Sequence, residues 1–269
     1  MAKLECSLMN YCAFAHLVCR ISVLVSFAFG LGLMVTTLAG ASERIIRFGI
    51  PEEGYPPYLM HVDEDINGIV GDVFVEIAKS LGYKADVVVL PEKRLLHQAS
   101  LGKLDAVASA LEWEDDTRTK FWTNGIISIS DNLVTTKARR LNGNDLAALK
   151  GKHIALMHGY TYPSLENALK NGDLHPTRVK RFDSLLRMVD RGRVDYGILD
   201  QNVAKWVMRE QDLKFAHGLH FVEPGFDEVQ YRIILYPTKD WSSFVQEFNI
   251  ALGALKAKGT WKKILDRYR

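Results

Sequence analysis

Cysteine is absent from the chain after residue 19. The three cysteines of this 269-residue sequence are Cys6, Cys12 and Cys19. The rest of the chain therefore holds no thiol that could form a disulfide, ligate a metal or act as a nucleophile. Cysteine-dependent catalysis and a disulfide-stabilised scaffold are both excluded for it.

The sequence also lacks an excess of charge of either sign. It has 34 Lys and Arg residues against 32 Asp and Glu residues, a formal net charge of +2. This balance favours neither nucleic acid nor an anionic membrane surface as a partner. The G-x-S-x-G, P-loop and G-x-G-x-x-G motifs are missing as well, so the common signatures of a serine hydrolase, a phosphate-binding loop and a dinucleotide site are not present.

Histidine spacing does not indicate a metal site. The pairs His217 with His220 and His153 with His158 are loosely similar to metal-binding pairs, but no third ligand falls at a suitable spacing. We expect these histidines to lie on the surface or in the core. No metal and no cofactor is expected.

The first 41 residues differ from the remainder. Lys3 and Arg20 flank a polar start, residues 21–38 are almost wholly apolar, and the small residues Ala39-Gly-Ala41 follow. This pattern predicts a secretory signal peptide that is cleaved after Ala41. An uncleaved membrane anchor is the alternative, because the apolar run is nearly long enough to span a bilayer. No cysteine follows the run, so a lipid anchor is not expected.

The remaining sequence alternates between strand and helix patterns. Strands are expected at residues 45–50, 85–90, 105–109, 152–157, 194–199 and 231–236, from short apolar runs bounded by Gly, Pro or Asp. Helices are expected at residues 72–81, 94–101, 162–169, 184–191, 242–258 and 261–269. This order predicts an α/β protein, with Asp72 as the cap of the first helix and residues 51–68 as a candidate binding loop.

One pattern occurs twice, at residues 95–108 and again ninety residues later at 185–198. In each copy a helix with a Leu-Leu pair ends at a glycine, Gly102 or Gly192, and an aspartate three residues later begins a strand. Glycine suits the end of a helix because it adopts a positive φ without strain. Any α/β protein can repeat such a unit, but here each copy also follows another strand and helix. We therefore expect two similar α/β lobes, with the repeated residues as framework.

At this point the sequence resembles a known family, the periplasmic solute-binding proteins of polar amino-acid ABC transporters (bacterial extracellular solute-binding proteins, family 3). The resemblance covers nearly all of the chain after residue 41. The matching segments are Tyr55-Pro-Pro-Tyr58, Gly102-Lys-Leu-Asp105, Arg118, Asp145 to Lys152, Gly159-Tyr-Thr161, Gly192-Arg-Val-Asp195, Asp200 and the last two helices with Gly259. Each segment is short, and their order and spacing carry the resemblance.

The resemblance implies a periplasmic binding protein-like fold of type II, in which two α/β lobes are joined by two hinge strands. It places the first lobe at residues 42–130 and 232–269, after a signal peptide at 1–41. The second lobe takes residues 131–231, with the hinge strands at its ends. The chain is expected to cross near residues 127–136 and to return near residues 229–236.

The resemblance also implies a set of ligand-binding residues. They are Tyr55, Tyr58, Ser109, Glu112, Arg118, Gly159, Thr161 and Asp200. In the family pattern Arg118 matches the arginine that binds the carboxylate of an amino acid, and a guanidinium suits that role because it can form two parallel hydrogen bonds. Thr161 matches an anion-binding threonine, and Asp200 matches the carboxylate that holds the ligand's ammonium group. The two tyrosines would form an aromatic wall.

Each of these residues also has a purely structural interpretation. Arg118 could be a solvated arginine among acidic neighbours, Thr161 a helix cap and Asp200 a turn former. The sequence departs from the family pattern as well, since Arg118 lies one residue further from Asp105 than usual, Pro51 stands where an acidic contact is common, and Glu112 replaces a small hydroxyl residue. A carboxylate at Glu112 would repel a ligand carboxylate or attract a basic side chain, so a cationic amino acid and a ligand of another class both stay open.

We expect an exported, monomeric receptor that is not an enzyme. It would capture a small polar solute, with an amino acid favoured, by hinge closure in the periplasm, and deliver it to an ABC permease in the inner membrane. Two alternatives remain. One is a periplasmic enzyme on the same fold, similar to a cyclohexadienyl (arogenate) dehydratase, with Glu112 or Glu166 as its acid. The other is a soluble ligand sensor that serves a membrane receptor.

Overall fold

The computed structural model describes residues 44–63, 65–114, 116–137 and 145–268, and the expected signal peptide lies outside them. In this part of the chain, no helix is long and apolar enough to cross a membrane. The strands are β1 (Arg44–Pro51), β2 (Met60–Val62), β3 (Asp65–Asn67), β4 (Tyr83–Leu90), β5 (Ala106–Ser109), β6 (Phe121–Trp122), β7 (Ile127–Thr136), β8 (His153–Met157), β9 (His175–Val179), β10 (Tyr196–Leu199), β11 (Leu219–Phe221) and β12 (Phe226–Leu235). The α-helices are α2 (Ile69–Ser80), α3 (Glu92–Ser100), α4 (Glu166–Lys170), α5 (Phe182–Asp190), α6 (Gln201–Glu210), α7 (Ser242–Ala257) and α8 (Thr260–Arg267), and short 3₁₀ segments are η1 (Leu111–Trp113), η3 (Leu146–Leu149), η4 (Pro163–Leu165) and η5 (Lys214–Gly218).

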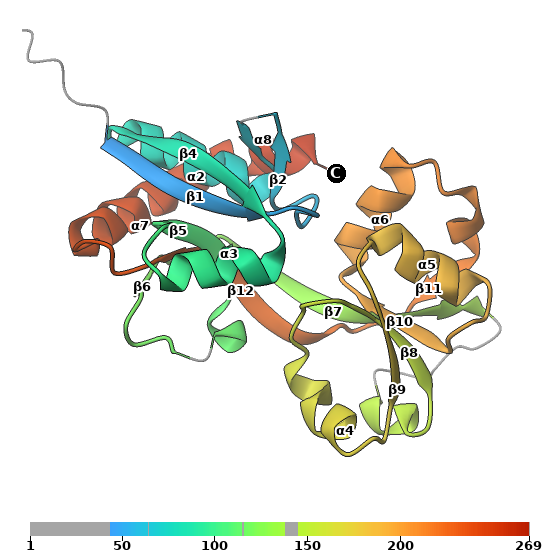
Figure 1. The fold of residues 1–269 in the computed structure, drawn as a ribbon. Coiled ribbons are helices and arrows are strands. Elements are labelled where there is room, and N and C mark those ends of the chain that lie inside the picture. The colour runs from blue at the N-terminus through green and yellow to red at the C-terminus, as the bar shows by residue number, and fades with distance from the viewer. Residues whose placement is uncertain (1–43, 64, 115, 138–144, 269) are drawn as a thin grey trace, which may run out of the picture. The chain divides into compact units, whose positions relative to one another are not determined.

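The first half of the fold is built on three parallel strands in the order β4-β1-β5. β1 pairs along its whole length with β4 on one side. On the other side, its residues Phe48 and Gly49 pair with β5. The chain passes from β1 to β4 through α2 and from β4 to β5 through α3, so the two crossovers run in opposite directions across the sheet. Because such crossovers are right-handed, α2 and α3 must cover opposite faces, and Figure 1 shows this arrangement.

The second half follows the same path. Its parallel strands have the order β9-β8-β10, with α4 between β8 and β9 and α5 between β9 and β10. The predicted α/β class and the predicted pair of similar units are therefore confirmed. The repeated sequence pattern corresponds in both copies to the last helix and strand of a half, α3 with β5 and α5 with β10.

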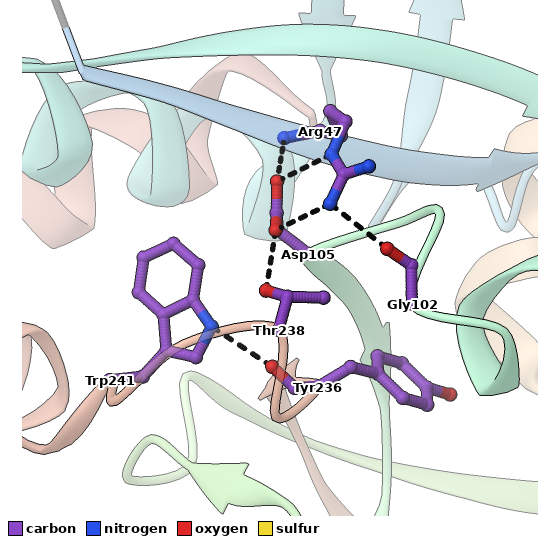
Figure 2. A network of polar contacts seen from close by, with 6 residues as sticks. All are labelled: Arg47, Gly102, Asp105, Tyr236, Thr238 and Trp241. Atoms are coloured by element: carbon purple, nitrogen blue, oxygen red, sulfur yellow. Dashed lines mark hydrogen bonds and ion pairs between the residues drawn. The ribbon is translucent and has the colours of Figure 1, made fainter.

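The repeated aspartates have matching structural roles. Asp105 accepts hydrogen bonds from the backbone nitrogen and the guanidinium of Arg47 on β1, each at 2.9 Å, and from the hydroxyl of Thr238 at 2.6 Å (Figure 2). Asp195 accepts a hydrogen bond from the backbone nitrogen of His153 on β8 at 2.9 Å. Each carboxylate thus ties the start of one strand to the central strand of its half. The arginine neighbour also keeps the pKa of Asp105 below its usual value, against the opposing effect of burial.

Two long antiparallel strands, β7 and β12, connect the halves. β12 pairs with β5 through residues 232–235 and with β7 through residues 226–231. β7 then pairs with β10 in the second half. After β12 the chain ends with α7 and α8, which pack against α2 in the first half. The whole sheet has the order β4-β1-β5-β12-β7-β10-β8-β9.

Some details differ from the sequence-based expectations. α2 begins at Ile69, because Ile69 and Val70 are buried and extend its apolar face, and its N-cap is Gly68 with a φ of 98°. Asp72 therefore lies inside the helix, where it accepts a hydrogen bond from the Tyr268 hydroxyl at 2.9 Å, and the expected cap was wrong. The sequence analysis also missed β9, because four of its five residues are exposed and no apolar alternation marks it.

Candidate functional site

The topology fixes where a ligand site is to be expected. In each half the crossovers reverse direction at the central strand, and such a reversal opens a crevice beyond the carboxyl ends of the parallel strands. The segments that leave these ends are the loop after β1, the end of β5 at Ser109, the loop after β8 that holds Gly159, and Asp200 after β10. Six of the predicted site residues, Tyr55, Tyr58, Ser109, Gly159, Thr161 and Asp200, lie on these segments.

A cavity of about 100 Å³ lies at this place. Its lining residues are Pro51, Tyr55, Glu92, Leu95, Leu96, Val107, Ala108, Ser109, Trp113, Glu114, Asp131, Gly159, Tyr160, Thr161 and Tyr231. They come from both halves, with Glu92 at the start of α3 in the first half and Gly159 after β8 in the second. These two residues lie close together, since a Cβ atom placed on Gly159 would lie 3.6 Å from the Cγ atom of Glu92. The predicted residues Tyr55, Ser109, Gly159 and Thr161 line the cavity.

Aromatic rings form much of the cavity wall. The ring centre of Tyr55 lies 5.7 Å from that of Tyr231 and 6.0 Å from that of Tyr160, both in edge-to-face contact. The ring centre of Trp113 lies 5.9 Å from that of Tyr231. Such rings offer negative π faces, which attract an ammonium or guanidinium group.

Three carboxylates line the same cavity. Glu114 forms an ion pair with Lys120 and accepts a hydrogen bond from the Ser109 hydroxyl at 3.0 Å. No hydrogen bond or ion pair between described residues involves the carboxylates of Glu92 and Asp131. Burial is the main cause that raises the pKa of Glu92, with a contribution from Glu114, and burial with the nearby Asp200 and Asp227 raises the pKa of Asp131 to about 8.

Of these three carboxylates, only Glu114 is paired with a basic side chain among the described residues, and that side chain, Lys120, is not part of the lining. None of the described residues around the cavity is Lys, Arg or His. Among all described residues, no group of three or more His, Cys, Asp or Glu side chains could hold a metal ion either. The cavity is therefore suited to an organic cation with apolar parts.

Asp200 and Tyr58, which the resemblance assigns to the ligand, contact each other instead. The Tyr58 hydroxyl donates to Asp200 at 3.1 Å to each carboxylate oxygen, and Asn202 donates to the Tyr58 oxygen at 2.9 Å. Asp200 is also the N-cap of α6, where it accepts from the backbone nitrogens of Asn202 at 2.7 Å and Val203 at 3.0 Å. Tyr58 and Asp200 are only 1% and 2% exposed, and they link the first half to the second.

Two other predicted residues also lie outside the cavity lining. Arg118 is exposed, and its backbone nitrogen donates to Asp116 at 3.1 Å in a turn between η1 and β6. Glu112 is exposed on η1. Thr161 lines the cavity but does not cap a helix, because the N-cap of η4 is Tyr162 without a side-chain hydrogen bond. The expected helix-cap interpretation of Thr161 was wrong.

Sequence reasoning missed Glu92, Glu114, Asp131 and Tyr231 as cavity residues. Glu92 could have been found, because it comes directly after the carboxyl end of β4 and a proline. Asp131 had a weaker signal, a charged residue in the middle of the long strand β7. Glu114 and Tyr231 had none, since their place depends on how β12 and η1 pack together.

A larger groove of about 780 Å³ is lined by residues of α6, α7, α8 and the start of β7, including Lys205, Trp206, Arg209 and Lys256. From the strand-end segments it takes only Pro57 and Tyr58 after β1 and Asn202 after β10, and neither the end of β5 nor the loop after β8 lines it. The cavity around Tyr55 is therefore the better candidate for the functional site.

Comparison with known proteins agrees with this architecture. The profile of the bacterial extracellular solute-binding proteins, family 3, matches residues 46–269. The L-arginine-binding protein of Pseudomonas aeruginosa is 26% identical over 239 residues, which cover 85% of this chain and 89% of that protein. The ABC transporter arginine-binding protein 1 of Escherichia coli is 26% identical over 255 residues, which cover 92% of this chain and 96% of that protein.

Among solved structures, an ancestral arginine-binding protein bound to arginine has a TM-score of 0.67 and 23% identity, and the match covers 83% of this chain and 97% of that chain. A histidine kinase sensor domain with similarity to periplasmic binding proteins has a TM-score of 0.69 and 16% identity, and the match covers 84% of this chain and 96% of that chain. The expected type II fold with two lobes is thus confirmed. The sequence relatives are named as binding proteins and not as enzymes.

Proposed function

Since the chain belongs to the bacterial extracellular solute-binding proteins of family 3, we propose that it captures a small organic cation between its two lobes outside the cytoplasm and delivers it to an ABC permease. The relatives named for arginine support a ligand with a basic group. Export through a signal peptide at residues 1–41 and release into the periplasm as a monomer belong to the same proposal.

The observation that carries this proposal is the charge of the cavity. It is lined by three carboxylates and four aromatic rings, those of Tyr55, Trp113, Tyr160 and Tyr231, and by no basic side chain among the described residues. Leaving a carboxylate away from water is costly unless a positive charge accompanies it. A cationic ligand would supply that charge and would pack its apolar parts against the rings.

Capture would proceed by hinge closure, with lobe boundaries at residues 130/131 and 231/232 on β7 and β12. The cavity lining comes from both lobes, so a ligand gains its full set of contacts only when the lobes are together. The ligand's preference for that state would shift the population toward it. The permease would then distinguish the loaded from the empty receptor.

A thermal-shift screen tests the proposal. The protein would be purified from the periplasmic fraction of an expression host and incubated with cationic, neutral and acidic amino acids and with organic amines. We expect cationic compounds to raise the melting temperature, because a ligand that binds only the folded state stabilises it by about 2.7 kcal/mol at a hundred times its Kd. No shift with any cation, or a shift with acidic compounds alone, would contradict the proposal.

A further inference from the structure

The ligand class can be narrowed further. We infer that the cavity takes a compact organic cation without an α-carboxylate, of the short alkyl diamine class, in preference to a zwitterionic amino acid. This inference rests on the proposed function of cation capture. It follows from the hydrogen bonds and ion pairs that the polar groups near the strand ends already form within the protein.

The first step concerns the position expected to bind an α-ammonium group. Asp200 accepts hydrogen bonds from the Tyr58 hydroxyl and from the backbone nitrogens of Asn202 and Val203. The backbone nitrogen of Ser130 donates another hydrogen bond to it, at 3.4 Å. With 2% of its surface exposed and these donors in place, Asp200 is not among the described residues that line the cavity. The Tyr58 hydroxyl takes the place that a ligand's ammonium would need.

The second step concerns the partner for an α-carboxylate. No basic side chain is found among the described residues that line the cavity. The nearby Lys120 is committed to Glu114, with which it forms a partly buried ion pair. Arg118 is exposed in a turn with Asp116. A ligand carboxylate in this cavity would therefore face Glu92 and Asp131 without a neutralising partner, at a cost from like-charge repulsion.

The third step concerns the charges that remain. Glu114 is neutralised by Lys120, so Glu92 at the start of α3 and Asp131 on β7 are the two lining carboxylates that have no ion-pair partner among the described residues. They enter the cavity from different elements, with the rings of Tyr55, Tyr160 and Tyr231 also in its lining. When Asp131 has lost its proton, as above pH 8, these two separate negative charges call for two positive charges on one ligand. A methylene chain between two ammonium groups would pack against the rings.

The fourth step concerns size. An engineered cavity of roughly 150 Å³ holds one benzene molecule, and this cavity measures about 100 Å³. By that measure it holds about four non-hydrogen atoms, so a four-carbon diamine, with six, fits it more nearly than arginine does. Arginine, with its guanidinium, chain and zwitterionic end, is about twice as large.

Matched ligand pairs provide the test. Putrescine, cadaverine and agmatine differ from ornithine, lysine and arginine only by the absence of the carboxylate. Titration calorimetry of the exported protein at pH 8.5 is expected to give an affinity at least tenfold higher for the diamine in the putrescine and cadaverine pairs. Equal or tighter binding of the amino acids would overturn this inference but would leave the proposed capture of cations intact. Binding of no member of any pair, with the protein folded by circular dichroism, would overturn both.

Two variants test the assigned charges. Glu92→Gln and Asp131→Asn are each expected to weaken putrescine binding at least tenfold, because each removes one of the two negative charges. Glu76→Gln, at an exposed position on α2 away from the cavity, is the matched control and is expected to leave the affinity unchanged. Melting curves confirm that each variant is folded. Unchanged putrescine affinity in both cavity variants would overturn the inference.

Discussion

At the scale of single residues, Asp131 links ligand binding to proton binding. It faces Asp200 and Asp227 as like charges, it lies near the phenol groups of Tyr55 and Tyr160, and it has no partner of opposite charge among the described residues. Its pKa is raised to about 8, mainly by burial. The carboxyl group is therefore largely protonated at pH 7 in the folded, unliganded protein, and a cation must displace that proton.

We accordingly expect cation affinity to rise with pH up to about 8 and to level off above it. If the ligand binds only the ionised form, affinity changes by about tenfold per pH unit below the pKa. Calorimetry between pH 6 and pH 9 measures this slope, and proton release in buffers of different ionisation enthalpy checks it. Asp131→Asn should abolish the slope, whereas the exposed Asp190→Asn should retain it. A flat profile in the unmodified protein would contradict the assignment.

The same group makes a prediction for stability. Between the unfolded pKa near 4 and the folded pKa of about 8, the folded state binds a proton that the unfolded state has lost, so the free energy of unfolding falls as the pH rises through this window. Asp131→Asn should remove this loss. We expect the variant to be more stable than the unmodified protein by about 3 to 5 kcal/mol at pH 8 and by about 1 kcal/mol at pH 4.5, as measured by urea denaturation. A gain of equal size at both pH values would argue against proton linkage.

At the scale of elements, helix α6 begins at a residue that also joins the two lobes. Asp200 caps the first turn of α6 and accepts the Tyr58 hydroxyl, so its removal costs a cap and leaves a buried phenol without its acceptor. We expect Asp200→Ala to lower the free energy of unfolding by about 2 to 4 kcal/mol. Asp145→Ala, at the exposed N-cap of η3, removes a capping hydrogen bond without a contact between lobes. It should lower the free energy of unfolding by about 1 kcal/mol. Equal losses in both variants would show that the contact with Tyr58 adds nothing.

The elements are also where sequence reasoning succeeded best. The helix ends at Gly102 and Gly192 and the strands that follow depend on local signals, because glycine at a positive φ and an aspartate at a strand start act within a few residues. The start of α2 was predicted three residues late, since the burial of Ile69 depends on contacts made by the whole lobe. The repeated unit could therefore be predicted from the sequence, while element boundaries set by burial could not.

The functional site was harder to predict than the fold. Tyr55, Ser109, Gly159 and Thr161, which the family resemblance assigned to the site, lie at strand ends and line the cavity. The partner of Asp200 did not, because Tyr58 is 142 residues away in the sequence and reaches it only through the packing of the two lobes. The placement of Arg118 in an exposed turn depends on a local hydrogen bond to Asp116 that the family spacing does not encode.

At the scale of the whole molecule, the contact between Tyr58 and Asp200 joins the two lobes. A hydrogen bond to a charged acceptor contributes about 1.5 to 3 kcal/mol, so its loss should shift the equilibrium toward separated lobes by on the order of tenfold or more. We expect Tyr58→Phe to increase the radius of gyration of the unliganded protein in small-angle X-ray scattering. Tyr83→Phe, whose hydroxyl accepts a hydrogen bond from Arg44 within the first lobe, is the control and should leave it unchanged. An unaltered scattering curve for Tyr58→Phe would contradict this role.

The Tyr58 hydroxyl also acts as a built-in competitor at Asp200. Because it is attached to the same chain, it competes at an effective concentration in the millimolar range or above, whereas dissolved solutes outside the cell are commonly far more dilute. A free ammonium group at micromolar concentration would need about a thousandfold intrinsic advantage to displace it. Under the proposed function, the hydroxyl would thus compete with the ammonium group of a zwitterion at Asp200 whenever the lobes are together, without any clash against its side chain.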